Sequence, residues 1–329
     1  AKMVRGLTGR WPLPIVNYTD RAMTGALVDL LRREKFELVH IDAIHLAGCE
    51  SALRAALGST PVFYNWHNIE SEYLERYAGE TPGRARRWYA RHTARQLYRV
   101  ESAILESARG HIVCSERERA MLARRAPAAR VAVIENGVAI PPMHAVESKL
   151  ATRGRILFVG SMAYPANAHA AVWFTREIWP RIREGFPHFR FSIVGYNPLP
   201  EVLALRDLPG VEVTGTVPDV APWYEGAFAS IVPVRIAGGT RLKILEAMAA
   251  GVPVVSTKLG AEGLAVSPGE NILIAESVED WRAAMGKLGD PATWNRQAGA
   301  ARALVEARYD WQEIGRTLVE TYRSWLQTQ

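Results

Sequence analysis

The chain has 329 residues, of which 48% are hydrophobic and 22% are charged, and its formal net charge is +6. This composition excludes an intrinsically disordered chain, a collagen-like chain and a coiled coil, and the length predicts two domains because a single core seldom grows beyond about 250 residues. Lysine supplies only six of the 40 basic residues, so the charge comes mainly from arginine, which favours anionic partners such as phosphate, anionic lipid or nucleic acid.

The two cysteines, Cys49 and Cys114, lie far apart and match no metal-ligand spacing, which indicates a reducing compartment and two plain core residues. No stretch reaches the roughly 18 apolar residues of a membrane span, and residues 1–30 lack the basic and apolar regions of a signal peptide. We therefore expect a cytoplasmic protein.

The first half of the chain contains four short runs rich in β-branched and aromatic residues, separated by segments with helical patterns. This alternation is typical of parallel α/β layers. A stretch rich in proline and polar residues, 139–154, predicts a linker, so we expect an N-terminal domain of residues 1–145, joined by the C-terminal helix at 311–329. The predicted strands are 38–42, 61–67, 111–115 and 131–136.

The second half contains more strands, and they again alternate with helical patterns. Six strands are enough for a complete Rossmann-like sheet in a domain of residues 154–310. The predicted fold class is therefore α/β, with two Rossmann-like domains of which the first is the shorter. The predicted strands are 155–159, 190–194, 211–214, 228–234, 252–256 and 271–275.

Several common site motifs do not occur in the sequence: G-x-G-x-x-G after a strand, G-x-x-x-x-G-K-[ST], G-x-S-x-G, H-E-x-x-H and the D-x-D carboxylate pair. A dinucleotide oxidoreductase, a P-loop NTPase and a zinc protease are therefore poor interpretations. The histidines are scattered, and His40 and His111, at strand starts, are expected to be satisfied core residues.

The most informative stretch is AGGTRLKILEAMAAGVPVVST, residues 237–257. It predicts a glycine-containing turn after a strand and then a helix from Thr240 that ends at Gly251. A helix N-terminus at the carboxyl end of a parallel strand favours an anion, and Gly238 and Gly239 allow the backbone to approach it closely.

Lys243 and Glu246 are three residues apart and share one face of this predicted helix. A cation near the helix N-terminus suits a diphosphate, and a carboxylate one turn later suits the vicinal hydroxyls of a ribose. The alternative is a surface Lys–Glu pair, but the apolar AMAAG that follows predicts a buried helix whose carboxylate needs a partner.

This stretch resembles the hallmark segment of family 4 retaining glycosyltransferases of the GT-B fold, and the resemblance extends over most of the chain. It is most similar to bacterial members that build cell-surface polysaccharides or glycolipids. The resemblance implies two Rossmann-like domains facing a cleft, with a nucleotide-sugar donor held mainly by the C-terminal one. Further matching segments are HNIES (67–71), VIENGV (133–138), ILFVGSMAYPANAHAAVWF (156–174), VGYNP (194–198), GTVPDVAPWY (215–224), GAEGL (260–264) and YDWQEI (309–314).

The resemblance also implies roles for individual residues. Glu246 would bind the ribose, and His67 would face the donor sugar, with a packed or capping histidine as the alternative. Gly160 would face the diphosphate or serve only as a turn glycine. The remaining implied donor contacts are Ser161, Gly238, Gly239, Thr240, Arg241 and Lys243.

Two further pairs have open roles. Asn136 and Gly137 resemble a turn near the hinge that can be purely structural, and Tyr164 and Asn167 could touch donor or acceptor, although Asn167 is equally typical of a helix N-cap.

The implied reaction transfers a hexose from a UDP- or GDP-sugar to a saccharide or lipid-linked acceptor with retained anomeric configuration. The leaving diphosphate itself could take the acceptor proton, so the protein would mainly stabilise charge on that group. Because D-x-D is absent, we expect no metal; Lys243, Arg241 and the helix N-terminus would provide the positive charge. No cofactor beyond the donor is implied.

The sequence departs from the family pattern at three places. Gly238 occupies the position of the first of two motif glutamates, and Ser161 stands where many members have a phosphate-binding arginine. The segment FELVHID (36–42) resembles a middle strand of the N-terminal domain, so the usual opening strands are expected to be missing. Two alternatives therefore stay open: a non-catalytic nucleotide-sugar-binding partner and a nucleotide-sugar epimerase.

The segment RARRWYARHTARQLYR, residues 84–99, combines six arginines with Trp88, Tyr89, Leu97 and Tyr98 at helical spacing. One hypothesis is that this face docks on anionic membrane, which would place the protein peripherally on the inner membrane face. The alternative is a solvated arginine-rich helix. Nucleic acid is a weaker interpretation because no recognisable reader module accompanies the charge.

Overall fold

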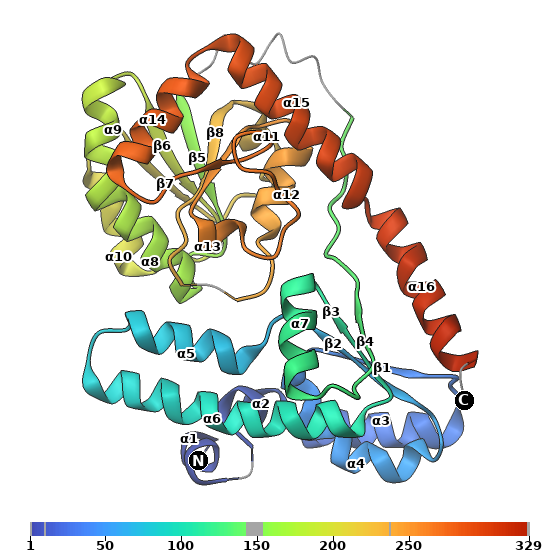
Figure 1. Cartoon of the computed structure of the whole chain (residues 1–329). Helices are drawn as coiled ribbons and strands as arrows, with labels where there is room; N and C mark the ends of the chain where they lie inside the picture. Colours follow the sequence, from blue (N-terminus) through green and yellow to red (C-terminus); the bar gives the residue numbers. More distant parts are fainter. Residues whose placement is uncertain (1, 10, 143–153, 237, 328–329) are drawn as a thin grey trace. The chain divides into compact units, whose positions relative to one another are not determined.

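The structure is a computed structural model that describes residues 2–9, 11–142, 154–236 and 238–327. The chain divides into two compact units, each built around one parallel sheet (Figure 1). The first unit comprises Ala1–Glu135, Gly238–Thr240 and Thr317–Gln329, and the second comprises Asn136–Ala237 and Arg241–Arg316. Most of the predicted linker, residues 143–153, and with it the expected boundary at residue 145, lies outside the described residues.

The sheet of the first unit has the strand order β1-β2-β3-β4, and all neighbouring strands are parallel. The register pairs Asp42, at the end of β1, with Asn65 near the end of β2. All four predicted strands are confirmed, each shorter than expected by one to three residues. Their bounds are β1 Val39–Asp42, β2 Val62–Trp66, β3 Gly110–Val113 and β4 Val131–Val133.

Helices precede the sheet of the first unit and connect its strands. Local capping explains several of the boundaries: the Asp20 side chain accepts a hydrogen bond from the Met23 backbone N–H at the start of α3, and Ser115 does the same for Glu118 at the start of α7. The helices are α1 Lys2–Thr8, α2 Leu13–Tyr18, α3 Arg21–Arg33, the 3₁₀ turn η1 Ile44–Leu46, α4 Ala47–Leu57, α5 Glu70–Glu80, α6 Arg84–Ser107 and α7 Glu116–Arg125.

The end of the last helix, α16 (Trp311–Gln327), packs on the first unit. The rings of Tyr322 and Trp325 lie with their centroids 5.2 and 5.5 Å from that of Phe63 on β2. The neighbouring strand leaves room for this contact only because residue 110 is a glycine: a Cβ there would come within 2.6 Å of the Trp325 ring.

The sheet of the second unit has the order β10-β9-β8-β5-β6-β7, again entirely parallel. All six predicted strands are confirmed, and the two expected at 252–256 and 271–275 are shorter than the apolar runs that predict them. The bounds are β5 Arg155–Val159, β6 Arg190–Val194, β7 Val211–Gly215, β8 Ala227–Val232, β9 Val254–Ser256 and β10 Leu273–Ile274.

Helices flank this second sheet, and most of them connect consecutive strands. They are α8 Pro165–Trp173, the π-helical turn η3 Phe174–Ile178, α9 Trp179–Gly185, α10 Pro200–Leu203, the 3₁₀ turn η4 Ala204–Asp207, α11 Ala221–Glu225, α12 Leu242–Ala249, α13 Lys258–Ala261, α14 Val278–Leu288 and α15 Pro291–Arg308. The two Rossmann-like α/β domains expected from the sequence are therefore present.

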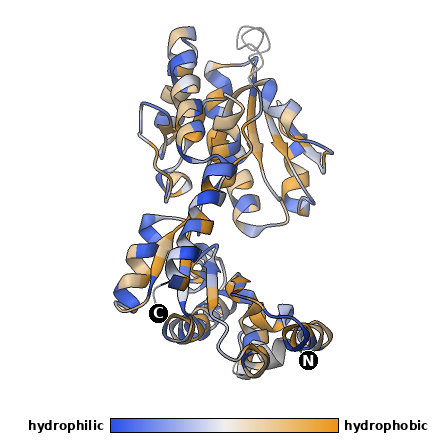
Figure 2. Cartoon of the chain, turned by 90° about the vertical axis from the view of Figure 1, so that its right-hand side faces the viewer, coloured by the Kyte–Doolittle hydropathy of each residue, from blue (hydrophilic) through white to orange (hydrophobic). Residues whose placement is uncertain are grey.

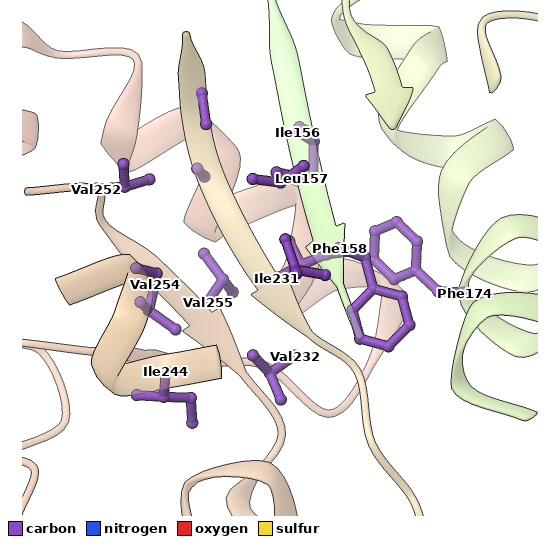
Figure 3. Close-up of a cluster of buried hydrophobic side chains, with 14 of the residues drawn as sticks. Ile156, Leu157, Phe158, Phe174, Ile231, Val232, Ile244, Val252, Val254 and Val255 are labelled. Atoms are coloured by element: carbon purple, nitrogen blue, oxygen red, sulfur yellow. The ribbon is translucent and has the colours of Figure 1, made fainter. Parts of the chain in front are cut away.

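The core of the second unit lies between its sheet and these helices. Phe158 of β5, Ile231 of β8 and Val255 of β9 are fully buried, and Figure 3 shows them gathered with Ile244 of α12. The strands of this sheet are accordingly among the most hydrophobic parts of the chain (Figure 2), as expected of parallel strands that are covered on both faces.

Cys49 and Cys114 are buried and unbridged, which confirms the expectation of plain core residues. Within the described ranges, no helix combines the length and the apolar character that crossing a membrane requires.

The contact between α16 and Gly110 generates a stability prediction. Gly110→Ala forces a methyl group against the Trp325 ring, so it should lower the free energy of unfolding by roughly 1–3 kcal/mol, as overpacking usually does. Gly79→Ala in α5 is the matched control, because nothing lies within 4 Å of a Cβ there and alanine favours a helix. Urea unfolding followed by circular dichroism compares the two; equal stability of both variants would show that the α16 contact tolerates the methyl group.

Candidate functional site

The stretch that stands out in the sequence forms a helix after the carboxyl end of β8. α12 is Leu242–Ala249, with Arg241 at the N-cap and Gly251 just after the C-cap at a φ of 69°, a conformation that favours glycine. The helix begins two residues later than predicted, and its apolar face, with Ile244, Leu245 and Met248, is buried. The end predicted at Gly251 and the expected burial are both confirmed.

Lys243 projects from the first turn of α12 toward the end of β5. Its Nζ donates a hydrogen bond to Asn167 Oδ1 at 2.7 Å and lies 4.4 Å from the centroid of the Phe158 ring. Burial lowers the pKa of Lys243, the negative charge of Glu246 partly opposes this and the nearby Arg241 adds to it, and together they bring the pKa to about 7. The ammonium is therefore poorly stabilised in the free protein, and a bound anion would favour its charged form.

Gly160, directly after β5, is the residue that makes room for this lysine. A Cβ at position 160 would lie 2.8 Å from both Lys243 Nζ and Asn167 Nδ2. Gly195, which follows β6, approaches the same backbone so closely that a Cβ there would lie 1.8 Å from the Gly160 carbonyl oxygen. The sequence singled out Gly160 but missed Gly195, whose only signal is its place in the segment VGYNP.

Asn167 connects Lys243 to the loop after β5. Its Nδ2 donates to the backbone carbonyl of Ser161 at 3.0 Å while its Oδ1 accepts from Lys243. The alternative of Asn167 as a helix N-cap is wrong: α8 begins at Pro165 with Tyr164 at the N-cap, because proline suits the first helical position. Asn167 is thus free to orient the lysine.

Glu246, one turn after Lys243, bonds to a different partner. The Tyr224 hydroxyl on α11 donates to Glu246 Oε2 at 3.2 Å. Burial raises the pKa of Tyr224 well above its ordinary value, and the negative charge of Glu246 raises it further. The phenol is therefore a neutral donor. Because Lys243 and Glu246 are hydrogen-bonded to different residues, the geometry does not favour the alternative of a surface Lys–Glu pair. In the sequence, Tyr224 has no signal beyond its place at the end of the segment GTVPDVAPWY.

Glu246 also lines a pocket of about 420 Å³ in the second unit, a size in the range of small-molecule sites. The lining is mainly apolar, and its charged residues are the carboxylates of Glu225 and Glu246 and the guanidinium of Arg302. The residues around the pocket are Gly137, Val138, Ala139, Pro141, Pro142, Val220, Ala221, Tyr224, Glu225, Leu242, Glu246, Ala249, Ala250, Arg302 and Trp311.

The arginine at the N-cap of α12 has a different environment from the one expected. Arg241 is buried, and its guanidinium donates to the carbonyls of Gly260 at 3.0 Å and of Glu262 at 2.6 Å. It therefore holds the GAEGL segment against α12, and a role toward phosphate stays a prediction.

Gly239 has a φ of 65°, which a turn residue without a side chain adopts readily; Gly238 and Thr240 flank it.

The remaining predicted residues fall into two places. His67 lies in the first unit, directly after β2, with its Nε2 2.9 Å from Asp42 Oδ1 at the end of β1. In the second unit, Gly137 packs under the Trp311 ring, where a Cβ would come within 2.6 Å, which favours a structural role for the turn at Asn136 and Gly137. Asp42 was not found from the sequence.

Family sequence models match both halves of the chain. The one described as "Glycosyl transferases group 1" matches residues 153–290, and "Glycosyltransferase Family 4" matches residues 4–140. The chain belongs to family 4 of the GT-B glycosyltransferases. The resemblance read from the sequence is thereby confirmed.

Individual relatives agree with this assignment. A glycogen synthase of Mycobacterium tuberculosis is 26% identical over 253 residues, 73% of this chain and 60% of the relative. A phosphatidyl-myo-inositol mannosyltransferase of Propionibacterium freudenreichii is 25% identical over 306 residues, 89% of this chain and 71% of the relative. This chain thus spans about 60% of the glycogen synthase and only 33% of the first curated relative, an uncharacterised protein of the Klebsiella pneumoniae cps region.

Solved structures share the fold at low sequence identity. Sucrose-phosphate synthase from Thermosynechococcus elongatus superposes with a TM-score of 0.73 at 20% identity, covering 95% of this chain and 81% of that one. HepE from Anabaena, in complex with UDP and glucose, superposes with a TM-score of 0.68 at 16% identity, covering 92% and 81%.

The environment of Lys243 predicts that diphosphate binding takes up a proton. Its pKa is about 7 in the free protein, and a bound diphosphate raises it, so at pH 8 binding of UDP should take up a proton and affinity should fall between pH 7 and pH 9. Calorimetry at pH 8 in two buffers of different ionisation enthalpy measures the uptake. Lys243→Met should abolish it, whereas Lys287→Met, at an exposed position on α14, should not. Uptake that persists without Lys243 would assign the proton to another group.

Proposed function

We propose that this protein is a glycosyltransferase that moves a hexose from a UDP- or GDP-sugar to a saccharide or lipid-linked acceptor with retention of configuration. The observation that carries the proposal is the placement of Lys243 at the first turn of α12, bonded to Asn167 and fitted over Gly160. A cation at the N-terminus of a helix that follows the carboxyl end of a parallel strand suits a diphosphate. Family membership supports the reaction class.

In this proposal, the nucleotide spans the length of α12. Glu246 accepts hydrogen bonds from the ribose hydroxyls, with Tyr224 holding the carboxylate, and the apolar pocket beside it takes the rest of the nucleoside. Lys243 contacts the diphosphate together with the backbone of Gly160, Ser161 and the turn at 238–240. The HepE structure contains UDP and glucose, which supports a nucleotide sugar as the ligand class.

The chemistry proposed for these residues is charge stabilisation. As the bond between sugar and diphosphate breaks, negative charge grows on the leaving group, and a lysine fixed beside it stabilises that charge more than it stabilises the substrate. Protonation of Lys243 on binding supplies this positive charge without a metal ion. His67 acts on the donor sugar, and the leaving diphosphate takes the proton of the acceptor hydroxyl.

We also propose that the α6 helix brings the protein to anionic membrane. Arg84, Arg87, Arg91 and Arg95 are exposed on it, and Trp88 has 62% of its surface exposed. Arginines interleaved with an exposed tryptophan suit an anionic lipid surface. Leu97, which the sequence placed on this face, is fully buried because it packs into the first unit with Ala90, Ala94 and Val100. Leu97 therefore does not belong to the exposed surface.

The roles of Lys243 and Glu246 separate by ligand. Glu246→Ala removes hydrogen bonds to a charged group worth roughly 1.5–3 kcal/mol, so uridine and UDP should both bind about tenfold or more weakly. Lys243→Ala should weaken UDP while leaving uridine nearly unchanged, because a lysine acts on the phosphates as a point charge.

Calorimetry in EDTA with uridine, UDP, guanosine and GDP measures these effects, with Glu201→Ala on α10 as an exposed control. UDP-glucose and GDP-mannose then test turnover by release of nucleotide and, with an acceptor, by transfer of the sugar. Binding that requires added Mg²⁺ contradicts the metal-free site; binding without turnover favours a non-catalytic partner, and conversion of the donor sugar favours an epimerase.

Membrane docking through α6 is tested by liposome sedimentation. The double change Arg87→Glu and Arg91→Glu should abolish salt-sensitive binding to vesicles containing phosphatidylglycerol, because each basic residue near an anionic surface contributes about 1 kcal/mol. The same charge reversal at Arg176 and Arg206 of the second unit is the matched control and should leave recovery unchanged. Equal recovery with neutral and anionic vesicles would rule the hypothesis out.

A further inference from the structure

A chain of hydrogen-bonding side chains runs along the carboxyl edge of the first unit's sheet. Asp42 ends β1, and the residue paired with it on β2 is Asn65, two positions before His67. Because neighbouring parallel strands end at the same edge, these side chains are brought together by the sheet register alone. Three of them point at one oxygen: Asp42 Oδ1 lies 2.9 Å from His67 Nε2, 2.8 Å from Asn65 Nδ2 and 3.5 Å from His40 Nε2.

The far side of His40 is held by the C-terminal helix. The Tyr322 hydroxyl of α16 forms a short hydrogen bond with His40 Nδ1, and the Tyr322 ring packs on Phe63. Burial raises the pKa of Tyr322 well above its ordinary value, with the Asp42 charge adding to the shift, so the phenol is neutral and donates. Because Nε2 of His40 faces the Asp42 carboxylate, which only accepts, the His40 proton is on Nε2 and Nδ1 accepts from the phenol.

Asp42 itself remains a carboxylate. Burial would raise its pKa, but the hydrogen bond from Asn65 and the charges and hydrogen bond of His67 and His40 outweigh burial and lower it. An ionised carboxylate accepts only, so a neutral His67 must carry its proton on Nε2 to bond with it. Its Nδ1 then has a lone pair available to accept a hydrogen bond.

We propose that Asp42 is the positioning residue for His67, fixing the ring as its Nε2–H tautomer with Nδ1 presented as an acceptor for a substrate hydroxyl, and that Tyr322 supports Asp42 through His40. The inference rests on the proposed function, in which His67 acts on the donor sugar, and it adds a device that selects one tautomer and one ring orientation. It also makes the end of α16 part of that device.

Asp42→Asn and Tyr322→Phe are the informative variants, because both keep the shape of the side chain. Asp29→Asn on α3 and Tyr77→Phe on α5 are the matched controls, since neither residue contacts this network. Long-range ¹H–¹⁵N spectra of the histidine rings at pH 8 report the tautomer of His67, assigned with His67→Gln. His40 and His45 are the neighbouring rings to be distinguished; burial and the nearby His67 charge lower the pKa of His45.

The expected result is a single Nε2–H tautomer of His67 in the unchanged protein and in both controls, a mixture of tautomers in Asp42→Asn and a partial loss in Tyr322→Phe. Nucleotide release from UDP-glucose or GDP-mannose adds a second readout: Asp42→Asn should lower kcat roughly tenfold or more, by comparison with the usual contribution of a positioned acid or base, with little change in KM. Combined with His67→Gln, it should have no further effect, since Asp42 acts only through His67.

A His67 ring that stays Nε2–H without the Asp42 charge, or that is Nδ1–H in the unchanged protein, overturns the inference. Additive losses of kcat in the double variant overturn it as well, since Asp42 would then act independently of His67. If the unchanged protein turns over no nucleotide sugar, the proposed function fails, while the ring spectra still decide the role of Asp42.

Discussion

The second unit depends on the placement of one cation, the ammonium of Lys243. It is partly withdrawn from water, next to the Phe158 ring, and it donates a hydrogen bond to the neutral amide of Asn167. Burial of an ammonium is costly, and although the Glu246 charge offsets part of this cost, the pKa of Lys243 is lowered to about 7. The charged form of such a group is favoured further when an anion binds beside it, as expected of a lysine in an anion-binding site.

The constraint on Lys243 spreads to the backbone around it. Gly160 cannot carry a side chain without displacing the ammonium and Asn167, and Gly195 cannot carry one without striking the Gly160 carbonyl. The residues directly after β5 and β6 must therefore be glycines. The backbone N–H groups of both glycines are hydrogen-bonded to neighbouring strand ends, Gly160 to the Val194 carbonyl and Gly195 to the Gly215 carbonyl, so the packing that holds the lysine also fixes this edge of the sheet.

Both units use the same physical device, the carboxyl ends of neighbouring parallel strands. In the second unit, the residues after β5 and β8 bring Gly160, Asn167 and Lys243 together. In the first unit, the ends of β1 and β2 bring Asp42, Asn65 and His67 together. Parallel strands end at a common edge, so residues distant in the sequence meet there without any dedicated loop. α16 contributes Tyr322 to the second of these clusters, from residues near the end of the chain.

The sequence by itself determined the fold class, ten strands within a few residues of their bounds, the family, and α12 with Lys243 and Glu246, because hydrophobic periodicity and glycine positions are local signals. It did not determine what those side chains contact. Tyr224 beside Glu246, Gly195 beside Gly160, Asn167 as a partner of Lys243 rather than an N-cap, the buried Leu97 and the whole Asp42 network follow from strand register and helix packing. Only the tertiary structure decides these pairings, because they join residues up to 282 positions apart, and no local pattern records which distant side chain a fold will bring within hydrogen-bond distance.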